Sequence, residues 1–504
     1  MLKRLQIIVF LAILIIILFL TNDFWENWFV GVISAFFSLS AFFIGIVIFL
    51  ENRNPSKTLT WLILLGMFPI VGFFFYLMFG QNRRKHKSFK EKAIVDEQAF
   101  HSIEGNRPLD ESKVQEMSDH QQKLFRLAHK LGNNPISFQT ETKVLTDGKE
   151  TFTYIKAALI KATDHIHMEY YIVRDDQLGN EIKEILIEKA KEGVVIRFLY
   201  DSVGSWKLSK QYIQQLRDAG VQMVPFSPVK IPLFNHRINY RNHRKIIVVD
   251  TKYAFIGGLN IGDEYLGKNR YFGHWRDTHL FVQGEAIRSL QLFFLRDWYY
   301  ATSETFLKQS YLSPNLLPKS FDDGGVQMIA SGPDTRWEII KKLFFTMITS
   351  SKKSIWIASP YFIPDDDILS ALKIASLSGV DVRLLVPSRP DKRIVFYASR
   401  SYFPELLDAG VKIYEYHRGF MHSKIIIVDH EIASIGTANM DMRSFHLNFE
   451  ANAFLYQTRS VEKLVSDFIF DMEHSTIIRP DVFKKRSFTH KLIESTSRLL
   501  SPLL

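Results

Sequence analysis

The 504-residue chain contains no cysteine, which excludes a disulfide framework, thiolate zinc or iron–sulfur sites, and a cysteine nucleophile. Acidic residues are outnumbered, with 53 Asp and Glu against 63 Lys and Arg. The resulting net charge of +10 indicates an anionic partner such as nucleic acid, acidic lipid or a phosphate-bearing substrate. The sequence has no P-loop, and no Gly-x-Gly-x-x-Gly sequence opens a helix, so a nucleotide-cradling loop is not expected.

Charged residues are also missing from three stretches near the N-terminus, residues 7–20, 29–50 and 59–79. A helix of about 20 apolar residues crosses a hydrocarbon core of about 30 Å. We therefore expect a membrane anchor over residues 1–80 with two to three transmembrane helices. The first stretch is short and follows Lys3 and Arg4, as in a signal peptide. No small-residue cleavage pattern follows it, which favours an uncleaved helix.

Basic residues flank the apolar stretches, and such residues favour the cytoplasmic face of a membrane. With three spans, the four Lys and Arg at positions 3, 4, 53 and 57 oppose the six from Arg83 to Lys92, a difference too small to decide the orientation. If the first stretch does not span, the other two form a hairpin and the basic segment lies in the cytoplasm. We expect a multi-pass protein of the cell membrane whose large C-terminal part faces the cytoplasm. Residues 81–134 are interpreted as a basic juxtamembrane and linker segment.

From about residue 135, short apolar strands alternate with helical stretches, the pattern of an α/β domain, and this pattern occurs twice. Leu216–Val221 is echoed by Leu406–Val411, and in both the Gly between helix and strand suits a left-handed helix cap. The clearest repeat is His243-Arg-Lys-Ile-Ile-Val-Val-Asp250, which lies 179 residues before His422-Ser-Lys-Ile-Ile-Ile-Val-Asp429. A repeat this long indicates a duplicated domain. We expect the two halves to pack about a pseudo-twofold axis that brings both blocks to one place.

The repeated block has the residue types that are needed to bind a phosphodiester and to exchange one of its ester bonds. Each copy supplies a His, a Lys two residues later and an Asn on a Gly-containing turn. These are His243, Lys245 and Asn260 in the first copy, and His422, Lys424 and Asn439 in the second. Lys and Asn would hold the nonbridging oxygens, while one His attacks phosphorus and the other protonates the leaving alkoxide. Since the two Lys supply positive charge, no metal or other cofactor is expected.

Other histidines do not complete a site of their own. His165 and His167 have metal-like spacing, but no further set of His and carboxylate residues accompanies them. We expect both to be ordinary strand residues.

The two blocks resemble the paired HKD motif of the phospholipase D superfamily, over about residues 135–480. A wider resemblance, to the bacterial cardiolipin synthase family, extends over nearly the whole chain. It rests on the N-terminal apolar stretches and on the runs Asn239–Lys245, Gly273–Asp277, Tyr416–His422 and Leu499–Leu504. The resemblance implies an α/β fold of two tandem phospholipase D-like domains, at residues 135–315 and 316–482.

The resemblance also implies roles by position. His243 and His422 would be the nucleophile and the general acid/base, and we favour His243 as the nucleophile. The two motif lysines and the two asparagines would bind phosphate. Asp250 and Asp429 match aspartates that support the motif histidines, and Glu450 matches a carboxylate that orients a histidine.

The first half departs from this pattern at two points. It has Tyr271 at the spacing that corresponds to Glu450, with Asp277 slightly later. It also has Gly258 where many relatives carry Ser. Both the carboxylate support and a hydroxyl contact are therefore uncertain in the first half.

The implied activity is a reversible phosphatidyl transfer between two phosphatidylglycerol molecules, which gives cardiolipin and glycerol through a phosphohistidine. We expect phosphatidylglycerol and anionic membrane lipid as partners and no nucleic acid. The alternatives are a membrane phospholipase D that hydrolyses phosphodiesters with the same site, an HKD-family nuclease, and a scaffold with degenerate motifs. Residues 483–504 mix basic residues with leucines, which predicts either an interfacial amphipathic helix or a helix packed on the catalytic part.

Overall fold

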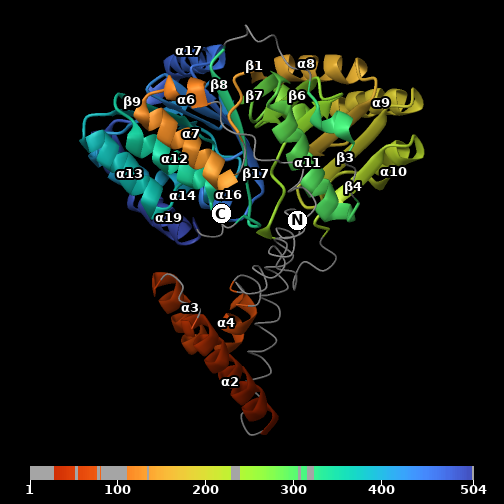
Figure 1. The fold of residues 1–504 in the computed structure, drawn as a ribbon. Coiled ribbons are helices and arrows are strands. Elements are labelled where there is room, and N and C mark those ends of the chain that lie inside the picture. The colour runs from red at the N-terminus through yellow and green to blue at the C-terminus, as the bar shows by residue number, and fades with distance from the viewer. Residues whose placement is uncertain are drawn as a thin grey trace. The chain divides into compact units, whose positions relative to one another are not determined.

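The computed structural model describes residues 28–50, 55–76, 80, 111–132, 135–228, 239–304, 308–314, 323–335 and 337–501. These residues fall into two compact units, an N-terminal helical unit and a larger unit that begins at residue 111 (Figure 1). The first apolar stretch, residues 7–20, and the basic segment Arg83–Lys92 lie outside the described residues.

The second apolar stretch forms the expected helix, α2 (Trp28–Leu50). Within the described ranges, its portion Gly31–Leu50 is the one helix long and apolar enough to cross a membrane. At a rise of about 1.5 Å per residue, 20 residues match the thickness of a hydrocarbon core. Its large side chains, among them Phe36, Phe42 and Phe49, are exposed as in a lipid-facing helix.

The third apolar stretch is not the single helix that we expected. It divides into α3 (Pro55–Met67) and α4 (Pro69–Phe75), and Phe68 between them has φ −135° and ψ 71°. The residue before a proline is driven out of the helical region by a clash with the proline ring. The chain then folds back, because the rings of Trp61 and Tyr76 lie 5.6 Å apart although 15 residues of continuous helix would separate them by about 22 Å. Gly72 permits this close return: a Cβ there would lie 2.9 Å from the Leu64 carbonyl oxygen.

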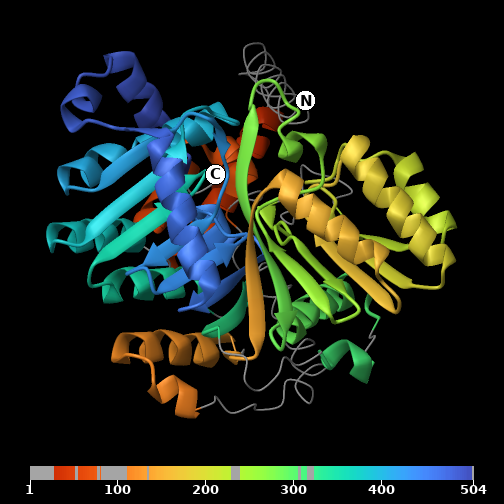
Figure 2. The same cartoon turned by 90° about the horizontal axis from the view of Figure 1, so that it is seen from above.

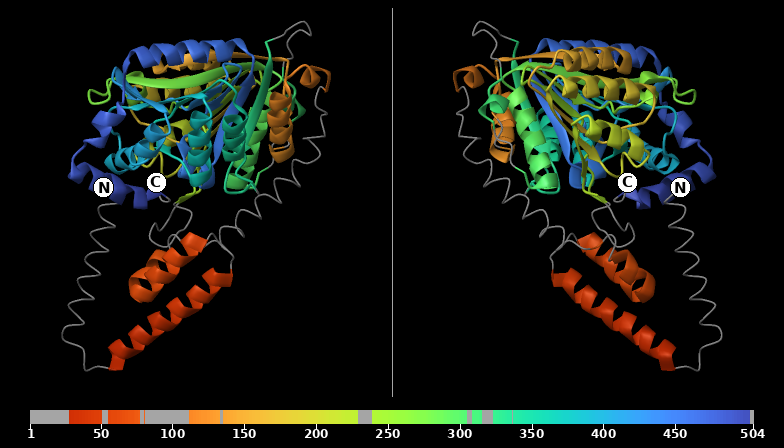
Figure 3. Two further views of the ribbon diagram at one scale, coloured as in Figure 1. Left: turned by 90° about the vertical axis from the view of Figure 1, so that its left-hand side faces the viewer. Right: turned by 90° about the vertical axis from the view of Figure 1, so that its right-hand side faces the viewer.

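The larger unit contains two large sheets that share the same order of seven strands, which confirms the predicted duplicated α/β fold. A small third sheet pairs β10 (Phe362–Ile363) with β16 (Met440–Asp441). In spatial order, the first sheet has β1 (Thr140–Asp147), β7 (His274–Gly284), β6 (Tyr253–Gly257), β5 (Ile246–Val249), β2 (His165–Tyr170), β3 (Val195–Asp201) and β4 (Gln222–Phe226). The second has β8 (Gly325–Ser331), β17 (Glu450–Tyr456), β15 (Ile432–Gly436), β14 (Ile425–Val428), β9 (Ser354–Ala358), β11 (Asp381–Pro387), β12 (Lys412–Tyr416) and β18 (Ser475–Ile477). In each sheet three strands run parallel, β2-β3-β4 and β9-β11-β12, and the other neighbours in these two orders pair antiparallel. The first sheet also gains β13 (Gly419–Met421) from the second half, which pairs parallel with β7. Figure 3 shows the second half, mostly blue, and the first half, mostly yellow and green, from opposite sides.

Helices cover the outer faces of both sheets (Figure 2). In the first half these are α8 (Gly148–Ile160), α9 (Gln177–Lys191) and α10 (Lys210–Asp218). In the second they are α12 (Ile339–Ser350), α13 (Asp366–Leu377), α14 (Arg393–Arg400) and α15 (Phe403–Asp408). The second half also has the shorter or peripheral helices α16 (Met442–His446), α18 (Pro480–Lys484) and α19 (Phe488–Leu499). Helices α11 (Ile287–Thr302) and α17 (Arg459–Glu473) pack instead in the core between the two halves. Gly220 and Gly410, which follow α10 and α15, have φ of 95° and 91°, so the predicted left-handed caps are confirmed.

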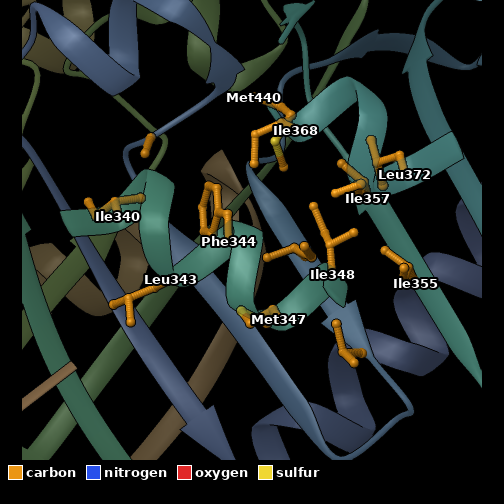
Figure 4. Close-up of a cluster of buried hydrophobic side chains, with 14 of the residues drawn as sticks. Ile340, Leu343, Phe344, Met347, Ile348, Ile355, Ile357, Ile368, Leu372 and Met440 are labelled. Atoms are coloured by element: carbon orange, nitrogen blue, oxygen red, sulfur yellow. The ribbon is translucent and has the colours of Figure 1, made fainter. Parts of the chain in front are cut away.

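The repeated apolar strands explain why the halves pack together. In β5, alternate side chains point to opposite faces, and all four are fully buried. Ile246 and Val248 pack in a core shared with Ile425 and Ile427 of β14, at the junction of the two halves. The other residues of these strands face the separate core of each half, one of which is shown in Figure 4.

Part of the expected linker is a structural element of the second half. Residues 111–132 form α6 (Glu111–Gln115) and α7 (Asp119–Gly132). Leu124, Phe125 and Ala128 of α7 are buried in the same core as Leu343 of α12. The amphipathic spacing of these residues stabilises the packing, so the linker interpretation is wrong for this stretch.

Candidate active site

The two motif histidines lie at the entrances of β5 and β14, and each is held by the other half of the molecule. The His243 amide donates to the Phe449 carbonyl oxygen at 2.9 Å, and the His422 amide donates to the Arg276 carbonyl oxygen at 2.7 Å. The first residue of β14, Ile425, pairs with Ala358 at the carboxyl end of β9. Both histidines therefore stand at the carboxyl ends of the parallel strands, as predicted for one shared site.

Each histidine also contacts a buried carboxylate from the opposite half. Nδ1 of His243 lies 3.0 Å from both carboxylate oxygens of Glu450, and Nδ1 of His422 lies 2.6 Å from Oδ2 of Asp277. Both carboxylate side chains are fully buried. Because Nδ1 is engaged in each ring, the carboxylates fix the orientation of both imidazoles.

Asp277 and Glu450 are equivalent by strand register although their sequence spacings differ. The repeat glycines pair with His279 in the first half, Gly257↔His279, and with Asn452 in the second, Gly436↔Asn452. Asp277 and Glu450 each precede that partner by two residues. The loop between turn and strand is six residues longer in the first half, which is why the sequence spacing pointed to Tyr271.

The motif lysines complete a buried cationic pair. Lys245 Nζ donates to the His243 carbonyl oxygen and Lys424 Nζ to that of His422, both at 2.6 Å. Burial lowers the pKa of Lys245 to about 7, with Glu450 acting against the shift and the charge of Lys424 adding to it. Burial lowers the pKa of Lys424 as well, against the attraction of Asp277. Two ammonium groups held this way favour an anion between them.

The pKa values of the two histidines and of their two carboxylates all lie below the ordinary values. Burial lowers the pKa of His243 and of His422 to about 4, and the neighbouring carboxylates only partly offset this. Burial would raise the pKa of Asp277, but Lys424 and His422 outweigh it and bring the value to about 2. The pKa of Glu450 is lowered too, because His243 and Lys245 outweigh its burial. The site thus holds neutral imidazoles beside ionised carboxylates, an arrangement suited to nucleophilic attack and proton transfer.

Comparisons with known proteins agree with this geometry. The domain family described as "Cardiolipin synthase, PLD-like domain" matches residues 155–298 and 344–472, and "Phospholipase_D-nuclease N-terminal" matches residues 38–81. A cardiolipin synthase of Alkalihalophilus pseudofirmus is 71% identical over 502 residues, and one of Halalkalibacterium halodurans is 70% identical over 502 residues. Both alignments cover 100% of each chain. The chain belongs to the cardiolipin synthase family.

Cardiolipin synthases of this type are phosphatidyltransferases of the phospholipase D superfamily, and they are membrane enzymes that act on phospholipids. The fold is also that of the phosphatidylserine synthase of Haemophilus influenzae, at a TM-score of 0.55 and 16% identity. That alignment covers 76% of this chain and all of the other.

In this cardiolipin synthase family member, the motif aspartates do not contact the histidines. The Asp250 carboxylate accepts hydrogen bonds from the amides of Thr163, Asp164 and His165, at 2.8–2.9 Å. Asp429 accepts the equivalent bonds from the amides of residues 352–354. Both lie at the far ends of β5 and β14, away from the site. The expectation that they support the histidines is therefore corrected: they anchor the chain that enters β2 and β9.

The two motif asparagines are held differently. Asn260 Oδ1 accepts from the Ile172 amide at 3.1 Å, and its Nδ2 donates to the Tyr265 hydroxyl at 3.2 Å. The backbone amide of Asn439 donates to Ser444 Oγ at 3.1 Å, and the side-chain Oδ1 of Asn439 is buried. Their contact with phosphate stays a prediction.

Gly258 and its counterpart Thr437 explain the unequal carboxylates. Thr437 Oγ1 donates to Glu450 Oε2, and Asn448 Nδ2 donates to Oε1 at 3.0 Å. In the first half there is no room for such a side chain, because a Cβ on Gly258 would lie 2.0 Å from Asp277 Oδ1. The hydroxyl contact found in the second half is thus replaced by the carboxylate itself.

Aromatic side chains line the site, and the motifs gave no signal for them. The Tyr171 ring lies 4.9 Å from His243, while Trp275 and Tyr361 lie 5.0 and 6.3 Å from His422. They follow or begin strands whose register the sequence does not reveal.

His165 and His167 are strand residues, as expected. Both are buried in β2, where His165 Nδ1 lies 2.8 Å from Asp164 and His167 Nδ1 2.6 Å from Gln291 Nε2. Across the described ranges, no group of three or more His, Asp and Glu is arranged to hold a metal ion.

Proposed function

We propose that this enzyme joins two phosphatidylglycerol molecules into cardiolipin and glycerol through a phosphohistidine. The observation that carries the proposal is the crossed arrangement of the site. Two imidazoles, each bound at Nδ1 to a buried carboxylate of the other half, accompany two buried lysines.

In the first step, Nε2 of His243 attacks the phosphorus of one phosphatidylglycerol. The bond from phosphorus to the terminal glycerol oxygen breaks, and His422 donates a proton to that oxygen, so glycerol leaves. In the second step, His422 takes the proton from the hydroxyl of a second phosphatidylglycerol. The resulting oxygen attacks phosphorus, the phosphorus–nitrogen bond breaks, and cardiolipin forms.

The protonated acid that the first step needs arises with substrate. The pKa of His422 is about 4 in the free protein, because burial and Lys424 disfavour the imidazolium. A phosphodiester brings a negative charge into the site, which raises the pKa of nearby groups and favours protonation. Lys245, Lys424, Asn260 and Asn439 would offset the charge that grows on the nonbridging oxygens.

Transfer rather than hydrolysis requires that water be kept from the phosphohistidine. The side chains of His243 and His422 are only 13% and 9% exposed, and aromatic rings flank both. Such enclosure favours a lipid hydroxyl over water as the second nucleophile.

Incubation of the purified full-length protein with phosphatidylglycerol in detergent tests the proposal. We expect cardiolipin and glycerol in equal amounts, and the reverse reaction when glycerol is added in excess. Phosphatidic acid without cardiolipin would overturn it in favour of a phospholipase D.

We also propose that the protein is a multi-pass protein of the cell membrane with its catalytic part in the cytoplasm. Since α3 and α4 fold back on each other, the chain would leave this hairpin on the face from which it entered. The basic residues at 53 and 57 then count together with the six from Arg83 to Lys92, and residues 21–27 carry none. If residues 7–20 also cross, ten of these Lys and Arg residues lie on the side of the catalytic part and none on the other side. If they do not cross, the numbers are eight and two. Both distributions favour a cytoplasmic catalytic part.

The absence of cysteine makes this orientation easy to measure. A membrane-impermeant maleimide should label Asn22→Cys in intact protoplasts, and it should label Leu377→Cys, which is 72% exposed in the native protein, only after permeabilisation. Labelling of Leu377→Cys in intact protoplasts would contradict the proposed orientation.

A further inference from the structure

Helix α19 has its polar side turned inward and its apolar side outward. Glu494 and Ser497 are buried, whereas Phe488, Leu492 and Leu499 are 79%, 55% and 81% exposed. The spacings of four and seven residues place these three on one side of the helix. Ser495, which is also exposed, lies between Leu492 and Leu499 on this side. A group of large exposed apolar side chains on one side of a helix is unfavourable in water and indicates an interaction surface.

The inward side is bound by specific polar contacts. Glu494 Oε2 accepts from Arg486 Nε at 2.7 Å. Arg498 forms an ion pair with Glu405 of α15 at 2.9 Å, and its guanidinium lies 4.4 Å above the ring of Tyr402. The helix is therefore fixed in this orientation, and the exposure of its apolar face is a feature of the packed structure.

The apolar face lies at the edge of the molecule that carries the active site. The Tyr361 ring is 6.3 Å from His422, and its hydroxyl donates to Asp391. Asp391 stands two residues before α14, and α14 packs against α19 (Figure 1). One helix thus connects the rim of the site to the exposed face.

Basic residues border this face. Lys485 and Lys491 are exposed, while Lys484 is paired with Asp408 at 2.8 Å, Asp481 is paired with Arg479 at 2.9 Å, and Glu494 is buried. The exposed charge beside the apolar face is therefore positive. An anionic lipid surface would attract this positive charge.

We propose that α19 is an interfacial helix whose face of Phe488, Leu492 and Leu499 inserts among the headgroups of an anionic bilayer. Docking there would bring the rim of the active site against the lipids. An interfacial helix has this combination of an apolar side and flanking Lys and Arg. The inference rests on the proposed function only in that the substrate lipids come from a bilayer.

The first half presents a second contact of the same kind. Trp206 is 60% exposed in the loop after β3, and Lys207 Nζ lies 5.4 Å from its ring. Ser205 in that loop donates to the carbonyl oxygen of Tyr171, whose ring packs on His243. Exposed Trp residues are typical of the membrane interface.

Because the chain has no cysteine, one engineered thiol reports on each position. An environment-sensitive fluorophore is attached to Leu492→Cys in the full-length protein. The labelled protein is then reconstituted in vesicles of phosphatidylglycerol and phosphatidylcholine that contain a spin-labelled quencher lipid. Leu377→Cys is the matched control, because Leu377 is also an exposed leucine, at 72% against 55%, but it lies where α13 leads into the amino end of β11, away from the carboxyl ends of the strands that hold the site. We expect blue-shifted, quenched emission at position 492 and neither effect at position 377.

Two results would overturn the inference. One is an unquenched label at position 492 that matches the control. The other is disulfide-linked dimers of Leu492→Cys, which would show that a second copy covers the face. This readout needs no turnover, so it is independent of whether cardiolipin or phosphatidic acid is the product.

Discussion

The two halves of the catalytic unit have the same topology but support their histidines differently. His243 contacts Glu450, which has the longer side chain and also accepts hydrogen bonds from Thr437 and Asn448. His422 receives Asp277, a shorter carboxylate that has Gly258 beside it in place of a hydroxyl. Each carboxylate belongs to the half that does not carry its histidine. Neither half therefore has a complete site, and a single half could not provide this chemistry.

The largest expected effect separates the roles of the two histidines. His243→Ala and His422→Ala should each lower cardiolipin formation by about 10³-fold or more, because nucleophile and proton carrier act as a unit. A substrate with a p-nitrophenol leaving group needs no proton for departure. On this substrate His422→Ala should still release p-nitrophenolate in a burst, measured by absorbance, whereas His243→Ala should not.

A burst from His243→Ala and none from His422→Ala would reverse the assignment of the nucleophile. Near wild-type cardiolipin formation in either variant would contradict the paired mechanism altogether.

The second-largest loss of activity is expected for variants of Asp277 and Glu450, the carboxylates that contact the histidine of the opposite half. Asp277→Asn and Glu450→Gln keep the shape of the side chain but remove the charge that fixes the imidazole and stabilises its protonated form. We expect each to lower kcat by about 10²–10⁴-fold with little change in KM. In the p-nitrophenol assay, Glu450→Gln should weaken the burst through His243, and Asp277→Asn should spare it.

If Asp277→Asn abolished the burst and Glu450→Gln did not, each carboxylate would act on the histidine of its own half. Circular dichroism of both variants controls for folding.

Much of this site could be predicted from the two motifs, and the remainder required the fold. The repeat spacing predicted that His243, Lys245 and their counterparts share one site, and the structure places both histidines at the carboxyl ends of the parallel strands. Asp277 was uncertain because a longer loop shifts its spacing, and only strand register shows that it matches Glu450. Pro69 was a signal in the sequence for the end of the helix at Phe68. Hydropathy could not show that the stretch then turns back, since both arms are apolar.

The residues beside the carboxylates should have a smaller and unequal effect. A methyl group on Gly258 would approach Asp277 Oδ1 to 2.0 Å, so Gly258→Ala must displace the carboxylate that orients His422. We expect a roughly tenfold loss of kcat, within the range for a misplaced catalytic group. Thr437→Ala is the matched variant in the second half, and it should cost less because Asn448 still donates to Glu450. Equal losses for the two, from initial rates on phosphatidylglycerol, would contradict the steric account.

The smallest effect on activity is expected for the motif aspartates, which the structure assigns to anchoring the chain. Asp250→Asn and Asp429→Asn would each weaken hydrogen bonds to three consecutive amides, at a cost of about 1–2 kcal/mol of unfolding free energy. Thermal unfolding should report lower Tm for both, while kcat of the folded fraction stays near wild type.

The backbone amides around Asp250 hold its pKa below the ordinary value although burial opposes them. The stabilisation from Asp250 is therefore present above the unfolded pKa and is lost as pH falls through the folded one. The difference in Tm between wild type and Asp250→Asn should accordingly shrink in acid, and a large loss of kcat at unchanged Tm would instead return this aspartate to the active site.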